Sequence, residues 1–177
     1  QLRKALIHGH AVLSSPPGSG KTTRVPLALL NEPWLGGRKI IMLEPRRPAA
    51  RMAARYMASL LGQKIGEQVG YQVRFDRKIG SNTRIEVLTE GLLSRRLQQD
   101  PELADVALVI FDEYHERNLV ADTGLALCLD VCASLREDLR LLVMSATLDE
   151  SQVASLIGGQ VVSSDGGLHP VAMHHLD

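Results

Sequence analysis

The chain has 177 residues, a formal net charge of zero and 45% hydrophobic residues. This length and apolar content suit one globular domain with a full core and exclude wholesale disorder. A neutral chain has no global positive field, so any nucleic-acid site has to be local. No stretch is long and apolar enough to span a bilayer and no signal peptide opens the chain, so we expect no membrane partner.

Strands and helices are predicted to alternate along the chain. The expected helices cover residues 1–10, 21–31, 48–61, 89–99, 122–135 and 150–157. The expected strands cover residues 11–13, 39–43, 69–75, 84–88, 106–111, 139–144 and 161–162. Nearly continuous apolar runs such as 39–43 are typical of strands that are buried on both faces. The pattern predicts an α/β fold with a doubly wound, mostly parallel sheet and helices on both faces.

The first motif is Ser15-Pro16-Pro17-Gly18-Ser19-Gly20-Lys21-Thr22-Thr23, between the first strand and the next helix. Gly18 and Gly20 allow positive φ angles that turn successive N–H groups toward one anion, and the helix N-terminus adds its dipole. Lys21 would place a charge on the outer phosphates, and the Thr22 hydroxyl is placed to bind Mg²⁺. Although Ser15 stands where the usual pattern has a glycine, the stretch predicts a nucleotide site.

A second motif follows the apolar run 106–111, which ends in Asp112-Glu113-Tyr114-His115. Asp112 would hold Mg²⁺ directly or through water, and Glu113 is placed to polarise the attacking water as general base. Adjacent carboxylates at a strand end repel each other unless a divalent cation lies between them. Taken together with the phosphate-binding loop, this pair favours an enzyme that hydrolyses a nucleoside triphosphate.

The segment between Arg38 and Arg55 holds six basic residues and a single acidic one, Glu44. Arg47, Arg51 and Arg55 recur every four residues and share a helix face, for which an ordinary solvated surface is the simplest interpretation. Arg46 differs, because it follows a buried strand at the edge where α/β sheets bind ligands.

Cysteine and histidine do not indicate a metal site. Cys128 and Cys132 lie in an apolar helical stretch without a second ligand pair, so we expect core packing, and a reducing cytoplasm as the default localisation. His169, His174 and His175 near the C-terminus form the kind of histidine-rich tail that usually binds no metal functionally.

Six motifs occur in the order found in DEAH-box helicases. They are Pro-Pro-Gly-Ser-Gly-Lys-Thr-Thr, Glu-Pro-Arg-Arg-Pro-Ala-Ala-Arg, Val-Gly-Tyr-Gln-Val-Arg-Phe, Leu-Thr-Glu-Gly, Asp-Glu-Tyr-His-Glu-Arg and Met-Ser-Ala-Thr-Leu. From about Ala11 to Leu148 the chain therefore resembles the first RecA-like domain of a DEAH-box helicase, a P-loop NTPase domain of superfamily 2.

The resemblance implies the cofactors, the partners and the role of each site residue. ATP and Mg²⁺ would be bound, and the partners would be a single-stranded nucleic acid, with RNA favoured over DNA, and a second RecA-like domain. The implied ATP-binding residues are Pro17, Gly18, Ser19, Gly20, Lys21, Thr22, Thr23 and Tyr56, with Thr22, Asp112 and Glu113 at the metal. The implied nucleic-acid contacts are Arg46, Arg47, Thr89, Glu90 and Gly91, and the implied coupling residues are His115, Ser145 and Thr147.

Three positions depart from the family pattern. Tyr114 replaces the alanine that names the family, and Pro48 replaces an aliphatic residue at a helix start, where proline is tolerated. Tyr56 stands where many relatives have an arginine that stacks on the nucleotide base. Its phenol ring either stacks in the same way or is a partly buried core aromatic.

Gln1 is not an initiator methionine, so we expect the chain to be part of a larger protein. Residues 1–168 would form the RecA-like ATP-binding domain, and residues 169–177 would begin the connection to a second one. Two other classes remain open: a small-molecule kinase with the same type of loop, and a scaffold that binds nucleotide without hydrolysing it.

Overall fold

A computed structural model of the chain describes residues 1–116, 118–146 and 150–164. The strands are β1 (Ala11–Ser14), β2 (Lys39–Glu44), β3 (Val69–Val73), β4 (Asp76–Lys78), β5 (Ile85–Thr89), β6 (Val106–Phe111), β7 (Arg140–Ser145) and β8 (Gln160–Ser163). The helices are α1 (Leu2–His8), α2 (Lys21–Leu29), α3 (Arg47–Leu60), α4 (Glu90–Gln99), α5 (Leu119–Ser134) and α6 (Glu150–Ile157). Short 3₁₀ turns cover Pro33–Leu35 and Tyr114–Glu116.

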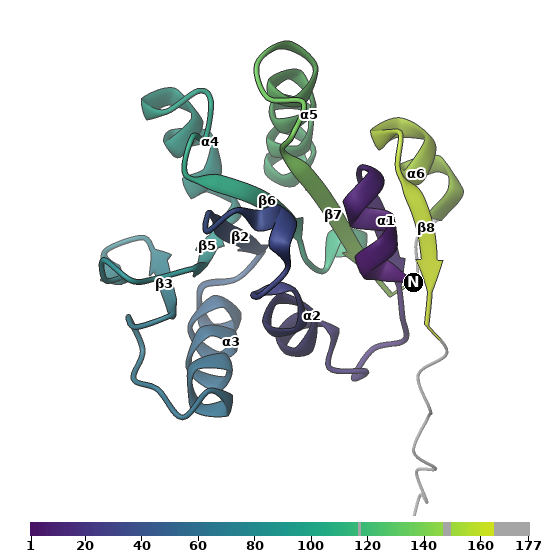
Figure 1. The fold of residues 1–177 in the computed structure, drawn as a ribbon. Helices are drawn as coiled ribbons and strands as arrows, with labels where there is room; N and C mark the ends of the chain where they lie inside the picture. The colour runs from purple at the N-terminus through teal and green to yellow at the C-terminus, as the bar shows by residue number, and fades with distance from the viewer. Residues whose placement is uncertain (117, 147–149, 165–177) are drawn as a thin grey trace, which may run out of the picture.

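The strands form an eight-stranded sheet in the order β4-β3-β5-β2-β6-β7-β1-β8. Every pairing is parallel except that of β3 with β4, which is antiparallel. The sheet has helices on both faces, with α2 and α3 on the side opposite α4, α5 and α6 (Figure 1). The predicted doubly wound, mostly parallel α/β fold is confirmed.

Two hydrophobic cores lie on the two faces of the sheet. Ile40 and Met42 contribute to the core beneath α1, α2 and α3, whereas Ile41 and Leu43 contribute to the core beneath α4, α5 and α6. All four side chains are buried, because alternate residues of a strand point to opposite faces. This explains why the run that ends in Glu44 is apolar without interruption.

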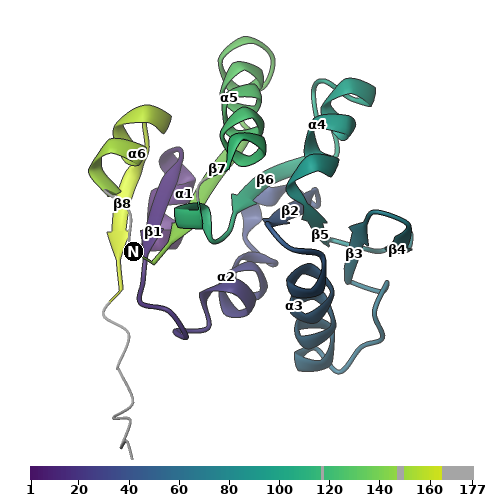
Figure 2. The ribbon, with the colours of Figure 1, turned by 180° about the vertical axis from the view of Figure 1, so that it is seen from behind.

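Parallel pairing brings the carboxyl ends of seven strands to one edge of the sheet, which we call the carboxyl edge; the opposite one is the amino edge. The β3–β4 hairpin lies at one end of the sheet and β8 lies at the other (Figure 2). The loops that carry the predicted motifs follow β1, β2, β5, β6 and β7, and all of them therefore meet at the carboxyl edge.

The predicted bounds of several elements are wrong by two or three residues, and the short strand β4 was not predicted. The strand expected to reach Phe75 ends at Val73, because Arg74 and Phe75 turn the chain into β4. The helix expected from Asp122 begins at Leu119, because the Asn118 side chain caps it by accepting a hydrogen bond of 2.8 Å from the Ala121 amide.

Cys128 and Cys132 are buried and free, as expected for core residues. The predicted connection at 169–177, with His169, His174 and His175, lies outside the described residues.

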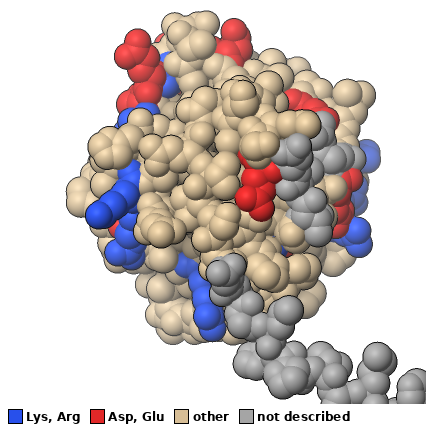
Figure 3. All heavy atoms as spheres, turned by 90° about the vertical axis from the view of Figure 1, so that its right-hand side faces the viewer, with Lys and Arg blue, Asp and Glu red and all other residues tan. Residues whose placement is uncertain are grey.

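The end of the molecule that carries β8 and α6 presents mainly uncharged side chains (Figure 3). Ile7, Leu156 and Val161 are among the exposed apolar residues there. Such a surface lacks the cations that bind a phosphate backbone, so we expect a nucleic-acid site on another part of the molecule. No helix within the described ranges is long and apolar enough to cross a membrane.

Candidate functional site

The predicted phosphate-binding loop has the expected backbone geometry. Gly18 and Gly20 have φ angles of 76° and 79°, in the region that side chains disfavour, and α2 begins at Lys21. The Gly20 carbonyl already accepts the Arg24 amide at 2.9 Å, so the first turn of the helix forms directly after the loop. The free N–H groups of that turn are the ones that bind anions at a helix start.

Lys21 and Glu113 meet across the site. The Lys21 side chain is 5% exposed, and its Nζ lies 3.4 Å from Oε1 of Glu113. The loop after β1 is therefore brought against the end of β6, although β7 lies between these strands in the sheet. The predicted phosphate-binding cation and the predicted general base lie close together.

Asp112 is buried at the end of β6, with 2% of its surface exposed. Its Oδ1 accepts the Glu113 amide at 2.9 Å, whereas Oδ2 is buried with no hydrogen-bond partner. Burial raises the pKa of Asp112, although the Thr22 hydroxyl and the Glu113 amide act in the opposite direction. An unsatisfied carboxylate oxygen next to a hydroxyl fits a hard cation such as Mg²⁺, which prefers oxygen ligands.

Glu113 has a φ angle of 49°, which is uncommon for a residue with a side chain. Such a conformation costs on the order of 1–3 kcal/mol and persists only where the surroundings enforce it. It turns the chain sharply into the Tyr114–Glu116 segment and leaves the Glu113 side chain 30% exposed. Nδ1 of His115 lies 3.3 Å from Oε2 of Glu113, so this predicted coupling residue contacts the predicted base.

Glu44 is a member of the site that the sequence analysis did not identify. It ends β2 with 2% of its surface exposed, and burial together with the Asp112 carboxylate raises its pKa to about 9. Glu113 and Glu116 add smaller effects in the same direction. The sequence did contain a signal for Glu44: it is the one acidic residue of the basic segment 38–55, and it lies at the end of a predicted strand.

The predicted nucleic-acid residues do not all lie together. Arg47, Thr89 and Gly91 line one groove of about 490 Å³, which Arg74, Leu92, Ser94, Arg95 and Gln98 complete. They meet because β2 and β5 pair in parallel, with Glu44 opposite Thr89. Three arginines and no acidic residue line this groove, so it suits phosphates. We call it the arginine groove.

Arg46 and Glu90 do not line the arginine groove. The Arg46 side chain is 71% exposed, and its guanidinium donates to Oε1 of Glu116 at 3.0 Å. Glu90 is partly buried at the start of α4, and burial raises its pKa. Arg46 therefore contacts the segment that follows Asp112 and Glu113.

Ser145, a predicted coupling residue, is fully buried at the end of β7. Its carbonyl accepts the Ser15 amide at 3.2 Å, which ties the end of β7 to the start of the phosphate-binding loop. Thr147, the other coupling residue predicted from the Met-Ser-Ala-Thr-Leu motif, lies outside the described residues.

The three departures from the family pattern have different surroundings. Tyr114 is buried, donates a hydrogen bond of 2.6 Å to Oδ1 of Asp122, and packs edge-on against Phe111 at 81°. It thus fills core space and leaves the neighbouring carboxylates in place. Pro48 lies in the first turn of α3, as expected. Tyr56 is 55% exposed on α3, so it is not a core aromatic, and base stacking stays a prediction.

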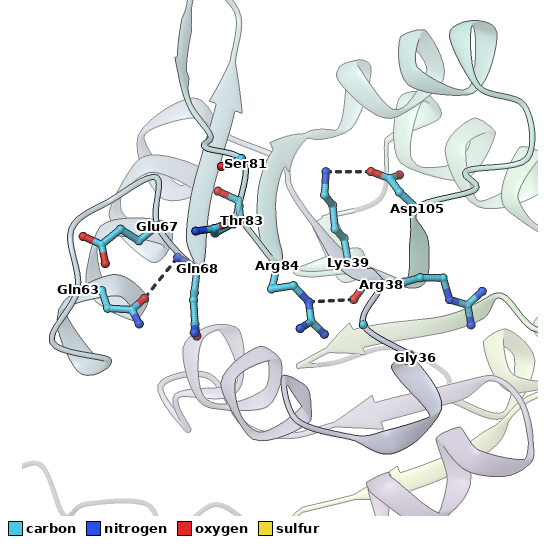
Figure 4. Close-up of a pocket in the computed structure, with 12 residues that line it drawn as sticks. Gly36, Arg38, Lys39, Gln63, Glu67, Gln68, Ser81, Thr83, Arg84 and Asp105 are labelled. Carbon is cyan, nitrogen blue, oxygen red and sulfur yellow. Dashed lines mark hydrogen bonds and ion pairs between the residues drawn. The ribbon is translucent and has the colours of Figure 1, made fainter.

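Two further hollows lie at opposite edges of the sheet. One, of about 410 Å³, lies against the phosphate-binding loop at Ser15, Ser19 and Lys21. The other, of about 840 Å³, lies at the amino edge, far from the predicted motifs (Figure 4). Its charged groups are already partnered: Lys39 pairs with Asp105 at 2.8 Å, and Arg84 donates to the Arg38 carbonyl at 3.3 Å.

A glycine loop that opens a helix, a buried lysine and paired carboxylates at the end of a parallel strand define a P-loop nucleotide-binding domain. A sequence profile described as DEAD/DEAH box helicase matches residues 2–156, and the chain belongs to this family.

The relatives include ATP-dependent RNA helicase HrpB of Escherichia coli strain K12, which is 52% identical over 166 residues, covering 93% of this chain and 20% of that protein. A probable ATP-dependent RNA helicase, the DHX35 homolog of Caenorhabditis elegans, is 35% identical over 93% of this chain and 24% of its own length. The crystal structure of the Escherichia coli DEAH/RHA helicase HrpB matches with a TM-score of 0.89 and 51% identity, covering 96% of this chain and 22% of that one. The chain therefore spans about a fifth of the length of these HrpB proteins.

Proposed function

We propose that this chain is the ATP-binding and hydrolysing motor domain of a DEAH-box RNA helicase. It would couple Mg-ATP hydrolysis to movement along a single strand, together with a second RecA-like domain. The observation that carries the proposal is the approach of Lys21 to Glu113 beside the unsatisfied Asp112 carboxylate. The similarity to proteins named ATP-dependent RNA helicases supports the class of reaction.

The phosphates of ATP would lie over the backbone amides from Gly18 to Thr23. Lys21 would neutralise the outer phosphates as a point charge. Thr22 and Asp112 would hold Mg²⁺, which when bound supplies positive charge to the transferring phosphoryl group. Glu113 would orient and deprotonate the attacking water, and its carboxylate lies 3.4 Å from the Lys21 ammonium.

His115 and Arg46 would connect hydrolysis to the nucleic acid. His115 lies beside the Glu113 carboxylate, so a change at the base reaches the Tyr114–Glu116 turn directly. Glu116 at the end of that turn pairs with Arg46, which belongs to the loop between β2 and α3. Arg47, the next residue and the first of α3, lines the arginine groove. This is a continuous chain of contacts from the predicted base to the predicted strand-binding surface.

The strand would be held by its phosphates in the arginine groove. Its arginines lie on three different elements or loops, and contacts to phosphates carry no sequence information, which suits a motor that moves over any sequence. The groove also weighs against a small-molecule kinase, which has no use for an extended phosphate-binding surface. A scaffold has no use for a strained glutamate aimed at the phosphate site.

The deciding experiment measures phosphate release from Mg-ATP by the natural protein that contains this chain. We expect a single-stranded oligouridylate to stimulate release, and Arg47→Ala to remove most of the stimulation while the unstimulated rate is unchanged. Oligodeoxyuridylate of equal length tests the preference for RNA. A kinase would transfer phosphate to a small acceptor without responding to the strand, and a scaffold would bind ATP without releasing phosphate.

The isolated chain of residues 1–177 should hydrolyse ATP slowly and separate no duplex. In related phosphoryl transfer an arginine finger is worth on the order of 10³–10⁵ in rate, and we propose that the second domain supplies it. Strand separation by the isolated chain would contradict the two-domain mechanism.

A further inference from the structure

Glu44 and Asp112 end two neighbouring strands, and each has only 2% of its surface exposed. Strands β2 and β6 pair in parallel with Leu43 opposite Phe111, and the Asp112 amide donates to the Leu43 carbonyl at 3.1 Å. The residues that follow this pair, Glu44 and Asp112, therefore stand next to each other at the carboxyl edge. A ligand of one carboxylate is thus a neighbour of the other.

One oxygen of each carboxylate lacks a hydrogen-bond partner among the described residues. These oxygens are Oε1 of Glu44 and Oδ2 of Asp112, and both are buried. Glu44 also forms no ion pair with any described residue. Because buried polar atoms are nearly always hydrogen-bonded, two neighbouring acceptors without donors indicate a ligand that supplies donors or positive charge.

Asp112 lies between Glu44 and the phosphate-binding loop. In the sheet, β6 separates β2 from β7 and β1, and the loop follows β1. The Thr22 hydroxyl at the start of α2 donates a hydrogen bond to the Asp112 carboxylate. An ion held by Thr22 and Asp112 therefore lies closer to them than to Glu44. Within the described ranges, no three acidic, histidine or cysteine side chains form a direct metal cluster, so Glu44 is placed to act through water.

Mg²⁺ binds few protein oxygens directly and keeps several of its waters, and nearby carboxylates accept hydrogen bonds from such waters. We propose that Glu44 is a further residue of the Mg²⁺ site, where its Oε1 accepts a hydrogen bond from the hydration shell of the ion. The proposal rests on the proposed ATP-hydrolysing function and deepens it. Glu44 is a positioning residue, because it acts on the reaction only by orienting the hydrated ion against Asp112.

This role makes metal binding depend on Glu44 even when no reaction takes place. Residues that orient the direct ligands of a metal typically change its affinity on the order of 10–100-fold when they are removed. Binding of a nucleotide without metal should not depend on Glu44, because the loop amides and Lys21 hold the phosphates. The two measurements separate a role at the metal from a general structural role.

The test measures Mn²⁺ binding to the natural protein with ADP by electron paramagnetic resonance, which requires no turnover. Glu44→Met keeps the length of the side chain and removes both oxygens, so it should weaken Mn²⁺ binding on the order of 10-fold. Glu44→Gln retains one acceptor oxygen and should lose less. The affinity for ADP in EDTA should be the same for the natural protein and both variants.

Leu43→Met is the matched control, because Leu43 precedes Glu44 on β2, is equally buried and points to the opposite face of the sheet. It should bind Mn²⁺ like the natural protein. Circular dichroism verifies that each variant is folded, and Glu44→Leu replaces Glu44→Met if that variant is not.

The outcomes separate this proposal from the proposed function. Unchanged Mn²⁺ binding in Glu44→Met, with lost binding in Asp112→Asn, would overturn the role of Glu44 and leave the ATP site intact. An equal loss of ADP affinity in EDTA would also overturn it, because the loss would not concern the metal. If Asp112→Asn bound Mn²⁺ like the natural protein, the metal site of the proposed function would fail, and the role of Glu44 with it.

Discussion

Glu44 and Glu86 are both 2% exposed and lie on the neighbouring strands β2 and β5, yet their surroundings are opposite. Glu86 lies toward the amino edge, between Lys39 at 2.8 Å and Arg96 at 2.5 Å. Glu44 lies at the carboxyl edge, where Asp112, Glu113 and Glu116 are its charged neighbours. Two cations thus balance the buried carboxylate of Glu86, whereas Glu44 faces other acidic groups and has no ion pair with any described residue.

This difference separates stability from function. A buried carboxylate that pairs with two cations stabilises the fold. Removing the carboxylate or a cation destabilises it, because the remaining buried charge has less compensation. Buried carboxylates without cations are unfavourable by themselves and persist at sites that use them. Substitutions at the carboxyl edge should therefore affect activity, and those at the amino edge should affect folding.

The largest effect is expected at the carboxyl edge. Glu113→Gln should lower ATP turnover on the order of 10²–10⁴-fold while ATP still binds, because the amide cannot accept a proton from water. Lys21→Ala should weaken ATP binding itself, because the phosphates lose their point charge. Nucleotide affinity and single-turnover rates of the natural protein distinguish the two effects. Equal losses of ATP affinity in both variants would contradict these assignments.

The next largest effect is expected at the amino edge. Glu86→Gln removes one of the two carboxylates that pair with Lys39 and Arg96, leaving Asp105, and should destabilise the fold by about 2 kcal/mol. Urea unfolding monitors this change, and ATP turnover per folded molecule should stay the same. A loss of turnover without a loss of stability would break the division between the two edges.

The same substitution at the other buried glutamate should act in the opposite direction. The folded pKa of Glu44 is raised to about 9, so its presence destabilises the natural fold increasingly as the pH rises from about 4.5 toward 9. Glu44→Gln lacks this effect, and each pKa unit corresponds to about 1.4 kcal/mol. The variant should therefore be similar in stability to the natural protein at pH 5 and increasingly more stable than it as the pH rises to 8.

This comparison is made by urea unfolding in the presence of EDTA, so that no metal compensates the carboxylates. Glu86→Gln is the matched control, since it should destabilise at pH 8. If Glu44→Gln destabilised the fold at both pH values, Glu44 would belong with Glu86 as a structural residue.

The smallest effect concerns Arg46. Arg46→Ala should weaken single-strand binding about equally for all sequences and reduce the salt dependence by about 0.7 in the slope of log affinity against log salt. Fluorescence anisotropy at several salt concentrations measures this slope. A loss restricted to certain sequences would point instead to a base contact. An unchanged slope would mean that Arg46 acts only through Glu116.

The sequence identified the parts of the fold and site that depend on local patterns. The phosphate-binding loop was predictable because Gly18 and Gly20 stand between an apolar strand and a helix, and Asp112 because it ends a buried strand. A tight turn with positive φ angles requires glycine, and a strand buried on both faces requires an apolar run, so both patterns are visible in the local sequence. Arg47, Thr89 and Gly91 line one groove, and their contact with a nucleic acid stays a prediction.

Other features depend on strand order and side-chain packing, which no local pattern contains. Glu44 was missed because its surroundings depend on Asp112, which lies three motifs later in the sequence and comes close only because β2 pairs with β6. The β3–β4 turn was missed because Arg74 and Phe75 lack the glycine or asparagine that usually marks such turns. The contact of Arg46 with Glu116 depends on a side-chain orientation that strand position alone does not determine.

The β4 strand has a consequence for the behaviour of the protein in solution. Its three residues, Asp76, Arg77 and Lys78, are all charged, and Arg77 and Lys78 are exposed at the outermost position of the sheet. An uncovered strand edge can pair with another chain, and short, charged edge strands oppose such pairing. By reversing direction at Phe75, the chain replaces the long apolar edge of β3 with a short charged one, and thereby protects the sheet against aggregation.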